Sequence, residues 1–287
     1  MDRRFEQYVK DVPVIPAVAA KVLSIAEGGL NISFRELENI IKMDPGLTAR
    51  ILKIANSAQY ARQREITQLQ SAITLLGFKT IRSVVLLVTA SGMFSRVRNT
   101  KFYREHWYHS LLTAFLAKLI AVTCRAREIS EEAFLAGLFH DIGRVPLYAS
   151  DPARYEGIIA RSRGERRLLR DVEAETLGTD HQQLGAAILD QWSFPPVYVD
   201  TAAEHDSVNI TSPHKSIIIM VSVANCTADL ATGEERIPQR VELLSRLVPY
   251  SCLKQEDVDA FVKDLPGALR RDPLFAECLG LYGVSGA

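Results

Sequence analysis

Apolar residues recur every three or four positions along most of the chain, a spacing that places them on one face of an α-helix. The segments 17–26, 47–54 and 67–76 all follow it. No segment shows the strict alternation of apolar and polar residues that is typical of a half-buried strand. The pattern therefore predicts an all-α protein built from many short helices.

Turn-forming residues separate these helical segments. Asp44-Pro45 ends one helix and begins the next, because aspartate is a favoured N-cap and proline fits the first turn. Gly77 ends the helix at 67–76. The following segment, 79–95, is apolar enough to pass for a strand, but its length and its helical neighbours favour a buried helix.

The second half of the chain shows equally clear helix boundaries. A long helix is predicted over 101–124, and Asp151-Pro152 begins another. Asp180-x-x-Gln183 is a capping pattern that places His181 in the first turn of a helix. The last fifty residues have the pattern of further amphipathic helices that cover the core.

Composition and charge argue against several classes of protein. Of 287 residues, 47% are hydrophobic and 24% charged, as in an ordinary globular protein, and Lys plus Arg equals Asp plus Glu at 34 each. This balance gives no overall field that favours nucleic acid or a membrane surface. A helix-turn-helix DNA reader near 76–82 would place only Lys79 and Arg82 at phosphates, so nucleic-acid binding is a weak alternative. One local group of basic residues is best interpreted as a solvated helix face: Arg161, Arg163, Arg166, Arg167 and Arg170.

The cysteines and the amino-terminal residues bear on the compartment. Cys124, Cys226, Cys252 and Cys278 lie far apart, without Cys-x-x-Cys spacing, which argues against a zinc ribbon or a redox pair and predicts reduced thiols. The first residues carry charge where a signal peptide would need an apolar run. The longest apolar stretch, 217–224, is too short to span a bilayer. We therefore expect a cytoplasmic protein without membrane insertion.

One stretch carries the main candidate chemistry. An apolar helix over 132–139 delivers His140 and Asp141 side by side, and Gly143 then breaks it. A buried His-Asp pair is costly unless it is hydrogen-bonded or coordinates something. A metal site would need ligands from several helices packed around one point, and separate helical regions supply His109, His181 and His205.

Several motifs together resemble those of a known family. They are Asp44-Pro-Gly-Leu-Thr-Ala-Arg50, Ala55-Asn-Ser-Ala58, Ala72-Ile-Thr-Leu-Leu-Gly77, Ala136-Gly-Leu-Phe-His-Asp-Ile-Gly143 and Leu177-Gly-Thr-Asp-His181. Over about residues 13–230 the chain resembles the HDOD domain, a bacterial signalling relative of the HD and HD-GYP metal-dependent phosphohydrolases. The resemblance implies an HD-like multi-helix bundle at 101–235. A smaller helical subdomain at 1–100 would precede it, and C-terminal helices at 236–287 would pack on it.

The resemblance also implies a metal site. Its ligands would be His109, His140, Asp141, His181 and His205, with Glu105, Asp206 and Asn225 as weaker candidates. Such a set of nitrogen and oxygen donors suits iron, manganese, zinc or nickel rather than calcium. Asp141 and Arg144 are the candidate catalytic residues, and Arg144 stands where HD-GYP relatives often hold a phosphate-contacting lysine. The other two histidines, His106 and His214, are expected at the surface or in turns.

Two departures from the catalytic relatives argue against hydrolysis. Catalytic HD enzymes complete the site with an aspartate on a late helix, where this chain has Val223-Ala-Asn225, and the missing charge should weaken binding of a divalent ion. Asp229, one helical turn further, is a weaker substitute. After His205 the chain also lacks the Gly-Tyr-Pro signature of the cyclic di-GMP phosphodiesterases.

The first interpretation is a non-catalytic output module of bacterial signal transduction. It would act by binding a signalling protein or a small ligand such as a nucleotide or phosphate. The alternative is a metal-dependent phosphohydrolase acting on a nucleotide or phosphoester, in which an ion lowers the pKa of an attacking water. A nucleic-acid regulator ranks below both.

Overall fold

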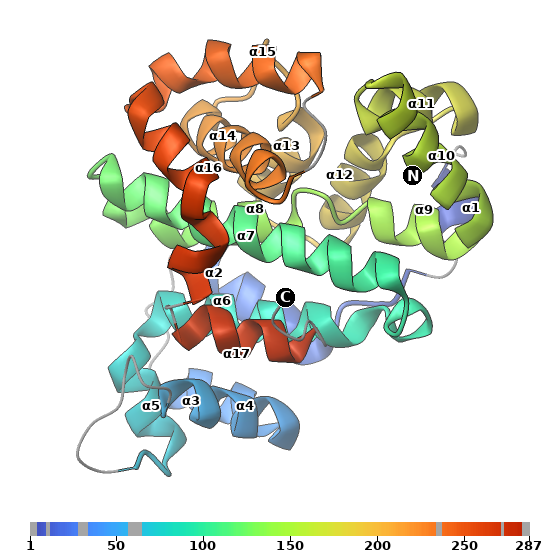
Figure 1. Ribbon diagram of the computed structural model, residues 1–287. Helices are drawn as coiled ribbons and strands as arrows, with labels where there is room; N and C mark the ends of the chain where they lie inside the picture. The colour runs from blue at the N-terminus through green and yellow to red at the C-terminus, as the bar shows by residue number, and fades with distance from the viewer. Residues whose placement is uncertain are drawn as a thin grey trace.

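Helices form the regular structure of this protein. The computed structural model describes residues 5–9, 12–27, 34–56, 65–233, 237–270 and 273–282, and no strand occurs within these ranges. Figure 1 shows the helices packed on both sides of a long central one. The all-α prediction is therefore confirmed.

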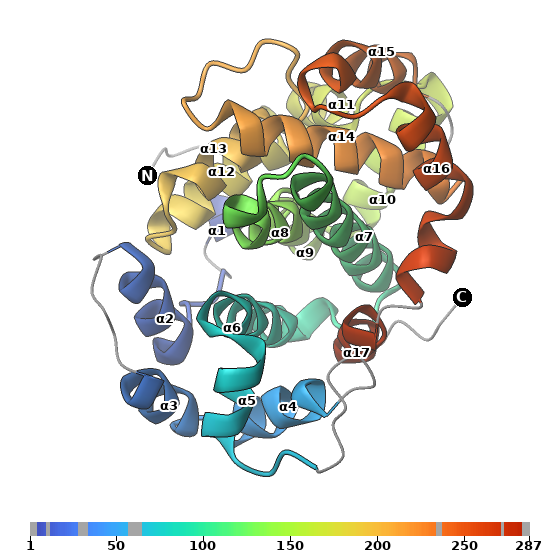
Figure 2. The same cartoon turned by 90° about the vertical axis from the view of Figure 1, so that its left-hand side faces the viewer.

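Three helices form the centre of the molecule. They are α7 (Lys101–Thr123), α8 (Ser130–Phe139) and α14 (Lys215–Ala231). α7 crosses the middle of Figure 1, and α14 lies above α7 and α8 in Figure 2. Buried residues occur around most of the circumference of α7, as is typical of a helix enclosed by others. The helix predicted over 101–124 is confirmed.

Five of the early helices gather at one end of the molecule, the lower part of Figures 1 and 2. They are α2 (Ala17–Glu27), α3 (Phe34–Lys42), α4 (Pro45–Ala55), α5 (Leu69–Leu76) and α6 (Phe78–Met93). Asp44 caps α4 as predicted, since its side chain accepts a hydrogen bond from the Leu47 amide at 3.0 Å. Gly77, with φ at 80°, separates α5 from α6 in a conformation that favours glycine. The segment that could have passed for a strand is helical, as predicted.

Within the described ranges, no single helix is both long and apolar enough to cross a membrane. The consecutive helices α5 and α6 together have the length and composition of a membrane span, but they meet at a bend of 112°.

A second group of helices surrounds the end of α8. It comprises α9 (Arg144–Ser150), α10 (Pro152–Glu165), α11 (Leu169–Leu177), α12 (His181–Gln191) and α13 (Pro196–Glu204), with the short α1 (Glu6–Val9) against α9. Asp151 and Asp180 cap α10 and α12, each accepting a backbone hydrogen bond from the residue three positions on. The predicted cap at Asp180 places His181 at the first residue of α12.

The remaining helices return to the centre. They are α15 (Pro238–Leu247), α16 (Gln255–Arg270) and α17 (Pro273–Leu281). α15 and α16 pack on α14, whereas α17 contacts α7 (Figure 1). Tyr282 stacks on Trp107 and donates a hydrogen bond to the Leu87 carbonyl at 2.9 Å. The division of the chain at 100 and 235 stays a prediction.

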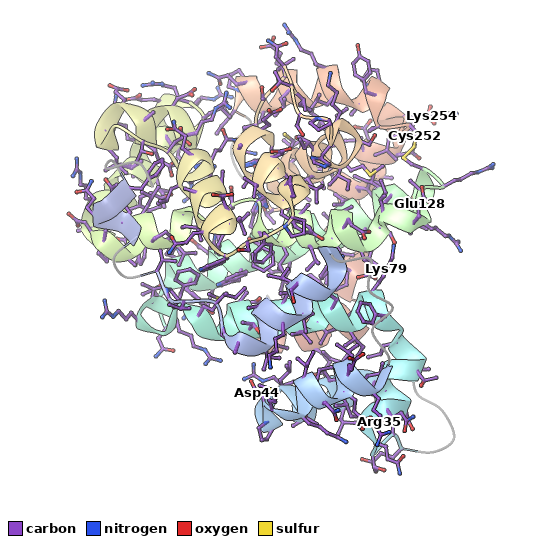
Figure 3. All side chains as sticks on the ribbon, turned by 180° about the vertical axis from the view of Figure 1, so that it is seen from behind. Arg35, Asp44, Lys79, Glu128, Cys252 and Lys254 are labelled. Atoms are coloured by element: carbon purple, nitrogen blue, oxygen red, sulfur yellow. A yellow bond between two sulfur atoms is a disulfide. The ribbon has the colours of Figure 1, made fainter. Side chains whose placement is uncertain are left out.

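One cysteine pair corrects the expectation of four reduced thiols. Cys124, just after α7, forms a disulfide with Cys252, and their Cα atoms lie 5.8 Å apart. Figure 3 shows the sulfur–sulfur bond beside Cys252. The two positions are 128 residues apart in the chain, so only the packing of the later helices on the centre brings them together. Cys226 and Cys278 are free and buried, as the expectation had it.

The basic residues considered for nucleic-acid contacts are engaged within the protein. Lys79 donates a hydrogen bond to the Glu128 carbonyl at 2.6 Å, and both residues are labelled in Figure 3. Arg82 is buried in an ion pair. Arg161 and Arg167 form ion pairs with neighbouring glutamates at the surface, as expected of a solvated helix face.

Candidate metal centre

The end of α8 carries the His-Asp pair into the core. Every residue of α8 except Glu132 is buried, and His140 and Asp141 follow with exposed fractions of 0% and 3%. α9 begins three residues later, at Arg144, so the pair lies in a tight turn between two helices. Polar groups at such a depth need partners.

Gly143 lets another helix approach this turn. A Cβ atom at position 143 would lie 2.1 Å from the carbonyl oxygen of His181 and 2.6 Å from the amide nitrogen of Gly185, both in the backbone of α12. Real Cβ atoms do not come so close to backbone atoms. The missing side chain therefore allows α12 to bring His181 beside Asp141.

Three histidines present the same ring atom to one carboxylate oxygen. The Nε2 atoms of His181 and His205 each lie 3.3 Å from Asp141 Oδ1, and Nε2 of His140 lies 3.6 Å from it. All four residues are at most 3% exposed. Neither His140 Nε2 nor His205 Nε2 has a hydrogen-bond partner within the described residues. Side chains at the ends of α8, α12 and α13 thus converge on a single point.

The other ring nitrogen of each histidine is held by an acceptor. Nδ1 of His140 lies 2.7 Å from a backbone carbonyl oxygen one turn earlier, and Nδ1 of His205 lies 3.1 Å from another. Nδ1 of His181 lies 2.6 Å from Glu173 Oε2. Because carbonyl and carboxylate oxygens only accept, each Nδ1 carries a hydrogen, and Nε2 of a neutral ring keeps its lone pair. Metal-binding histidines are oriented in this way.

His109 extends the group on the side of α7. Its ring centroid lies 5.4 Å from that of His140, and ligand atoms of His109, His140 and Asp141 all lie within 4.8 Å of one another. Nδ1 of His109 lies 3.2 Å from Asp229 Oδ1. Asp229 therefore supplies a carboxylate on this side of the group, where Asn225 offers only an amide.

Charge governs how this buried group is stabilised. Burial would raise the pKa of Asp141, but the positive charges beside it, on the Arg144 guanidinium and the His181 ring, hold that pKa well below its usual value. Burial lowers the pKa of His140 to about 3, which keeps its ring neutral. Burial also opposes charge on His181, but Glu173 and Asp141 outweigh it and raise the pKa of His181 to about 9. Without an ion, His181 is thus the cation that faces the carboxylate.

Of the remaining candidate residues, one lies outside the group and the others lie beside it. Glu105 is exposed on α7, 3.4 Å from Lys101, and is not brought into the group, because it lies on the face of the helix that is turned toward solvent. Nδ2 of Asn225 donates to Asp206 Oδ1 at 3.3 Å, and both residues are buried beside the group. Arg144 donates to Asp141 Oδ2 at 2.8 Å and so leaves Oδ1 facing the histidines.

The expectation for one other histidine was wrong. His106 is 3% exposed and packs between the rings of Phe102 and Trp107, because α7 is enclosed by other helices. Burial lowers the pKa of His106 well below its usual value, so the ring is neutral. His214 lies in a turn as expected, with Nδ1 2.9 Å from Asp200 Oδ2.

Two charged residues beside the group had no signal in the sequence. Glu173, fully buried on α11, accepts hydrogen bonds from the His181 ring, from the His181 amide and from the Tyr155 hydroxyl. The basic residues shortly before Glu173 in the sequence predicted only a solvated helix face. Arg240 reaches in from α15, with Nη1 2.8 Å from Asp229 Oδ2. Asp229 itself was detectable, because it lies one helical turn after the position at which catalytic relatives place an aspartate.

The donor set fits a divalent transition-metal ion. Imidazole Nε2 atoms and a carboxylate oxygen are the ligands that such ions prefer, and each ring is fixed by a second interaction. Two further buried oxygens beside the group, Asp206 Oδ2 and Asn225 Oδ1, have no hydrogen-bond partner among the described residues. His140, Asp141 and the histidines of α12 and α13 would hold the ion.

Residues 12–208 match the sequence model of the HDOD domain. The chain belongs to the HDOD family. The match includes the His-Asp pair and ends soon after His205, so helices α14 to α17 of this HDOD protein lie beyond it. The resemblance inferred from the motifs is confirmed.

Solved structures share this fold. A Shewanella amazonensis protein named "Putative phosphohydrolase" is 22% identical, with a TM-score of 0.74 and 98% of both chains covered. A Geobacter sulfurreducens "HDOD domain protein with unknown function" is 23% identical, with a TM-score of 0.72 and 97% and 96% covered. A Marinobacter aquaeolei "Putative signal transduction protein" is 18% identical, with a TM-score of 0.76, covering 99% of this chain and 62% of that one. At these identities the likeness shows the fold.

A curated relative is a longer protein. An uncharacterized protein of Treponema pallidum is 21% identical over 237 residues, which make up 80% of this chain and 45% of the relative. The chain therefore spans about half the length of that relative.

Proposed function

We propose that this HDOD protein is a non-catalytic signalling module whose buried centre holds a divalent transition-metal ion. The observation that carries the proposal is the convergence of three histidine Nε2 atoms on Asp141 Oδ1, at 3.3 to 3.6 Å, with every Nδ1 held by an acceptor. Iron, manganese, zinc and nickel all suit these donors. When bound, such an ion supplies positive charge and Lewis acidity.

The burial of the ligands supports a role without turnover. His140, Asp141, His181 and His205 are at most 3% exposed, so a substrate could reach them only after the surrounding helices had moved apart. Asn225 also stands where the catalytic relatives have an aspartate. An ion held in this way fixes the relative positions of several helices and so sets the state of the module.

The second candidate function is a metal-dependent phosphohydrolase, and one observation favours it. The side chains of His109 and Arg144 are 14% and 20% exposed, so they connect the centre to the surface. Arg144 could therefore contact a phosphate group from outside. A nucleotide or phosphoester would be the substrate in this case.

The proposal includes a partner. A protein of a signalling pathway would read the state of the module in the cytoplasm, and a nucleotide or phosphate ligand is a candidate input. The name of the Marinobacter relative supports the signalling role, and the name of the Shewanella relative supports the alternative.

Metal analysis of the purified protein tests the centre. We expect bound iron, manganese, zinc or nickel in the wild type, its loss in His181→Ala, and its retention in His214→Ala. The last variant is a matched control, because His214 also pairs with an aspartate but lies outside the group. If the wild-type protein contained no metal, both as purified and after incubation with each of these ions, the proposed metal centre would be refuted.

A hydrolysis screen separates the two functions. Phosphodiesters and nucleotides would be tested with added manganese or iron, and the proposal expects no turnover. Hydrolysis that disappears in His140→Ala would establish the enzyme instead. A pull-down with metal-loaded and chelator-treated protein then identifies a partner whose binding follows the metal.

A further inference from the structure

Arg240 brings a positive charge into the centre from outside the HDOD match. It lies in the first turn of α15, and its side chain is only 16% exposed. Its Nη1 atom lies 2.8 Å from Asp229 Oδ2 and 3.6 Å from Asp206 Oδ1. One guanidinium thus faces two buried carboxylates.

Asp229 borders the His109 side of the centre, whereas Asp206 lies on the His205 side, with its Oδ2 atom 4.0 Å from His205 Nε2. The other oxygen of Asp229 lies 3.2 Å from Nδ1 of His109, and Asp206 accepts a hydrogen bond from Asn225. Asp229 is the acidic group that a second ion, on the side of His109, His140 and Asp141, would need as an additional ligand. Arg240 already forms an ion pair with it.

We propose, on the basis of the proposed function, that Arg240 is a built-in cation that takes the place of a second metal ion. The centre then holds one ion, at His140, Asp141, His181 and His205, and the His109 side remains without metal. Asp141 belongs to both sets of ligand atoms, so the chain has the donors of a paired site but fills half of it with its own side chain.

The charge of the buried group supports a single ion. Four carboxylates lie in it, from Asp141, Glu173, Asp206 and Asp229, and two guanidiniums, from Arg144 and Arg240. With neutral imidazoles this leaves two negative charges, which one divalent ion balances. A second divalent ion would leave two uncompensated positive charges in a buried site, which is strongly unfavourable.

The chemistry of arginine makes this substitution stable. A lysine or a histidinium could lose its proton when a metal ion approached, and so give up its place. A guanidinium does not lose its proton in proteins, so Arg240 keeps its charge. Only movement of α15 or replacement of the side chain would open the position.

The test is the number of ions per chain, measured with manganese by elemental analysis and by electron paramagnetic resonance, which distinguishes isolated from coupled ions. We expect one isolated ion in the wild type and up to about two coupled ions in Arg240→Gln. The second ion should be lost again when His109→Ala is added. Arg240→Lys should bind no more manganese ions per chain than Arg240→Gln. Arg246→Gln is the control, because Arg246 lies on the same helix but pairs with Glu242 at the surface.

The outcomes separate this inference from the proposed function. A wild type with two ions per chain would overturn the role of Arg240, whether or not the variants fold. A folded Arg240→Gln protein that still binds one ion would also overturn it. A wild type that binds no ion at all would instead refute the metal centre.

Discussion

Replacing Gly143 with alanine should damage both the fold and the centre. The added Cβ would lie 2.1 Å from the His181 carbonyl oxygen, whereas ordinary contact begins at 3.4 Å. The first turn of α12 must therefore move by about 1.3 Å, and it carries His181 with it. We expect the free energy of unfolding to fall by about 1–3 kcal/mol or more, and metal affinity to fall by about tenfold to a hundredfold.

Gly157→Ala is the matched control for this change. Gly157 lies on α10, where a Cβ would meet nothing within 4 Å, so alanine should stabilise the protein by about 0.5–1 kcal/mol. Urea unfolding followed by circular dichroism gives the stabilities, and titration with zinc or manganese gives the affinities. A Gly143→Ala protein with wild-type stability and wild-type metal affinity would show that α12 does not depend on this close approach.

Three further predictions concern the surroundings of the centre. Glu173→Gln should weaken metal binding by about tenfold to a hundredfold, because it removes the charge that orients His181; unchanged affinity in a titration would contradict this. In the metal-free protein the pKa of His181 is raised to about 9, so the protonated ring stabilises the fold. This stabilisation is complete below about pH 6.5 and is lost as the pH rises through 9. Urea unfolding at increasing pH should show this decline in the wild type but not in Glu173→Gln. Reduction of the Cys124–Cys252 disulfide should lower the free energy of unfolding by about 2–5 kcal/mol, and a Cys124→Ser protein should be insensitive to reductant.

Local signals made much of the fold predictable. The caps at Asp44, Asp151 and Asp180 depend on a few neighbouring residues, and all three helices begin where the sequence indicated. The helix α6 followed from its length and its neighbours, although its composition would also suit a strand. Periodicity and capping are short-range properties, so a single sequence contains them.

The centre was only partly predictable, because its members are joined by packing. The family motifs contain His140 and His181, and the resemblance implied His109 and His205 as their companions. Glu105 shares a helix with His109 but points to solvent, and only the path of α7 through the molecule decides this.

Other partners depend entirely on how the helices pack. Glu173 lies next to a charged surface segment, and Arg240 and Cys252 come from the last helices and their turns. No spacing rule connects such positions.

The distribution of the candidate ligands along the chain has a consequence for folding. An ion at the centre would act as a cross-link between His140, His181 and His205, which are separated by 41 and 24 residues. Closing loops of this size costs conformational entropy, so an unfolded chain has little affinity for the ion and the free energy of metal binding adds to that of folding. Release of the ion would then require the helices that carry its ligands to separate, and metal exchange should be as slow as that opening.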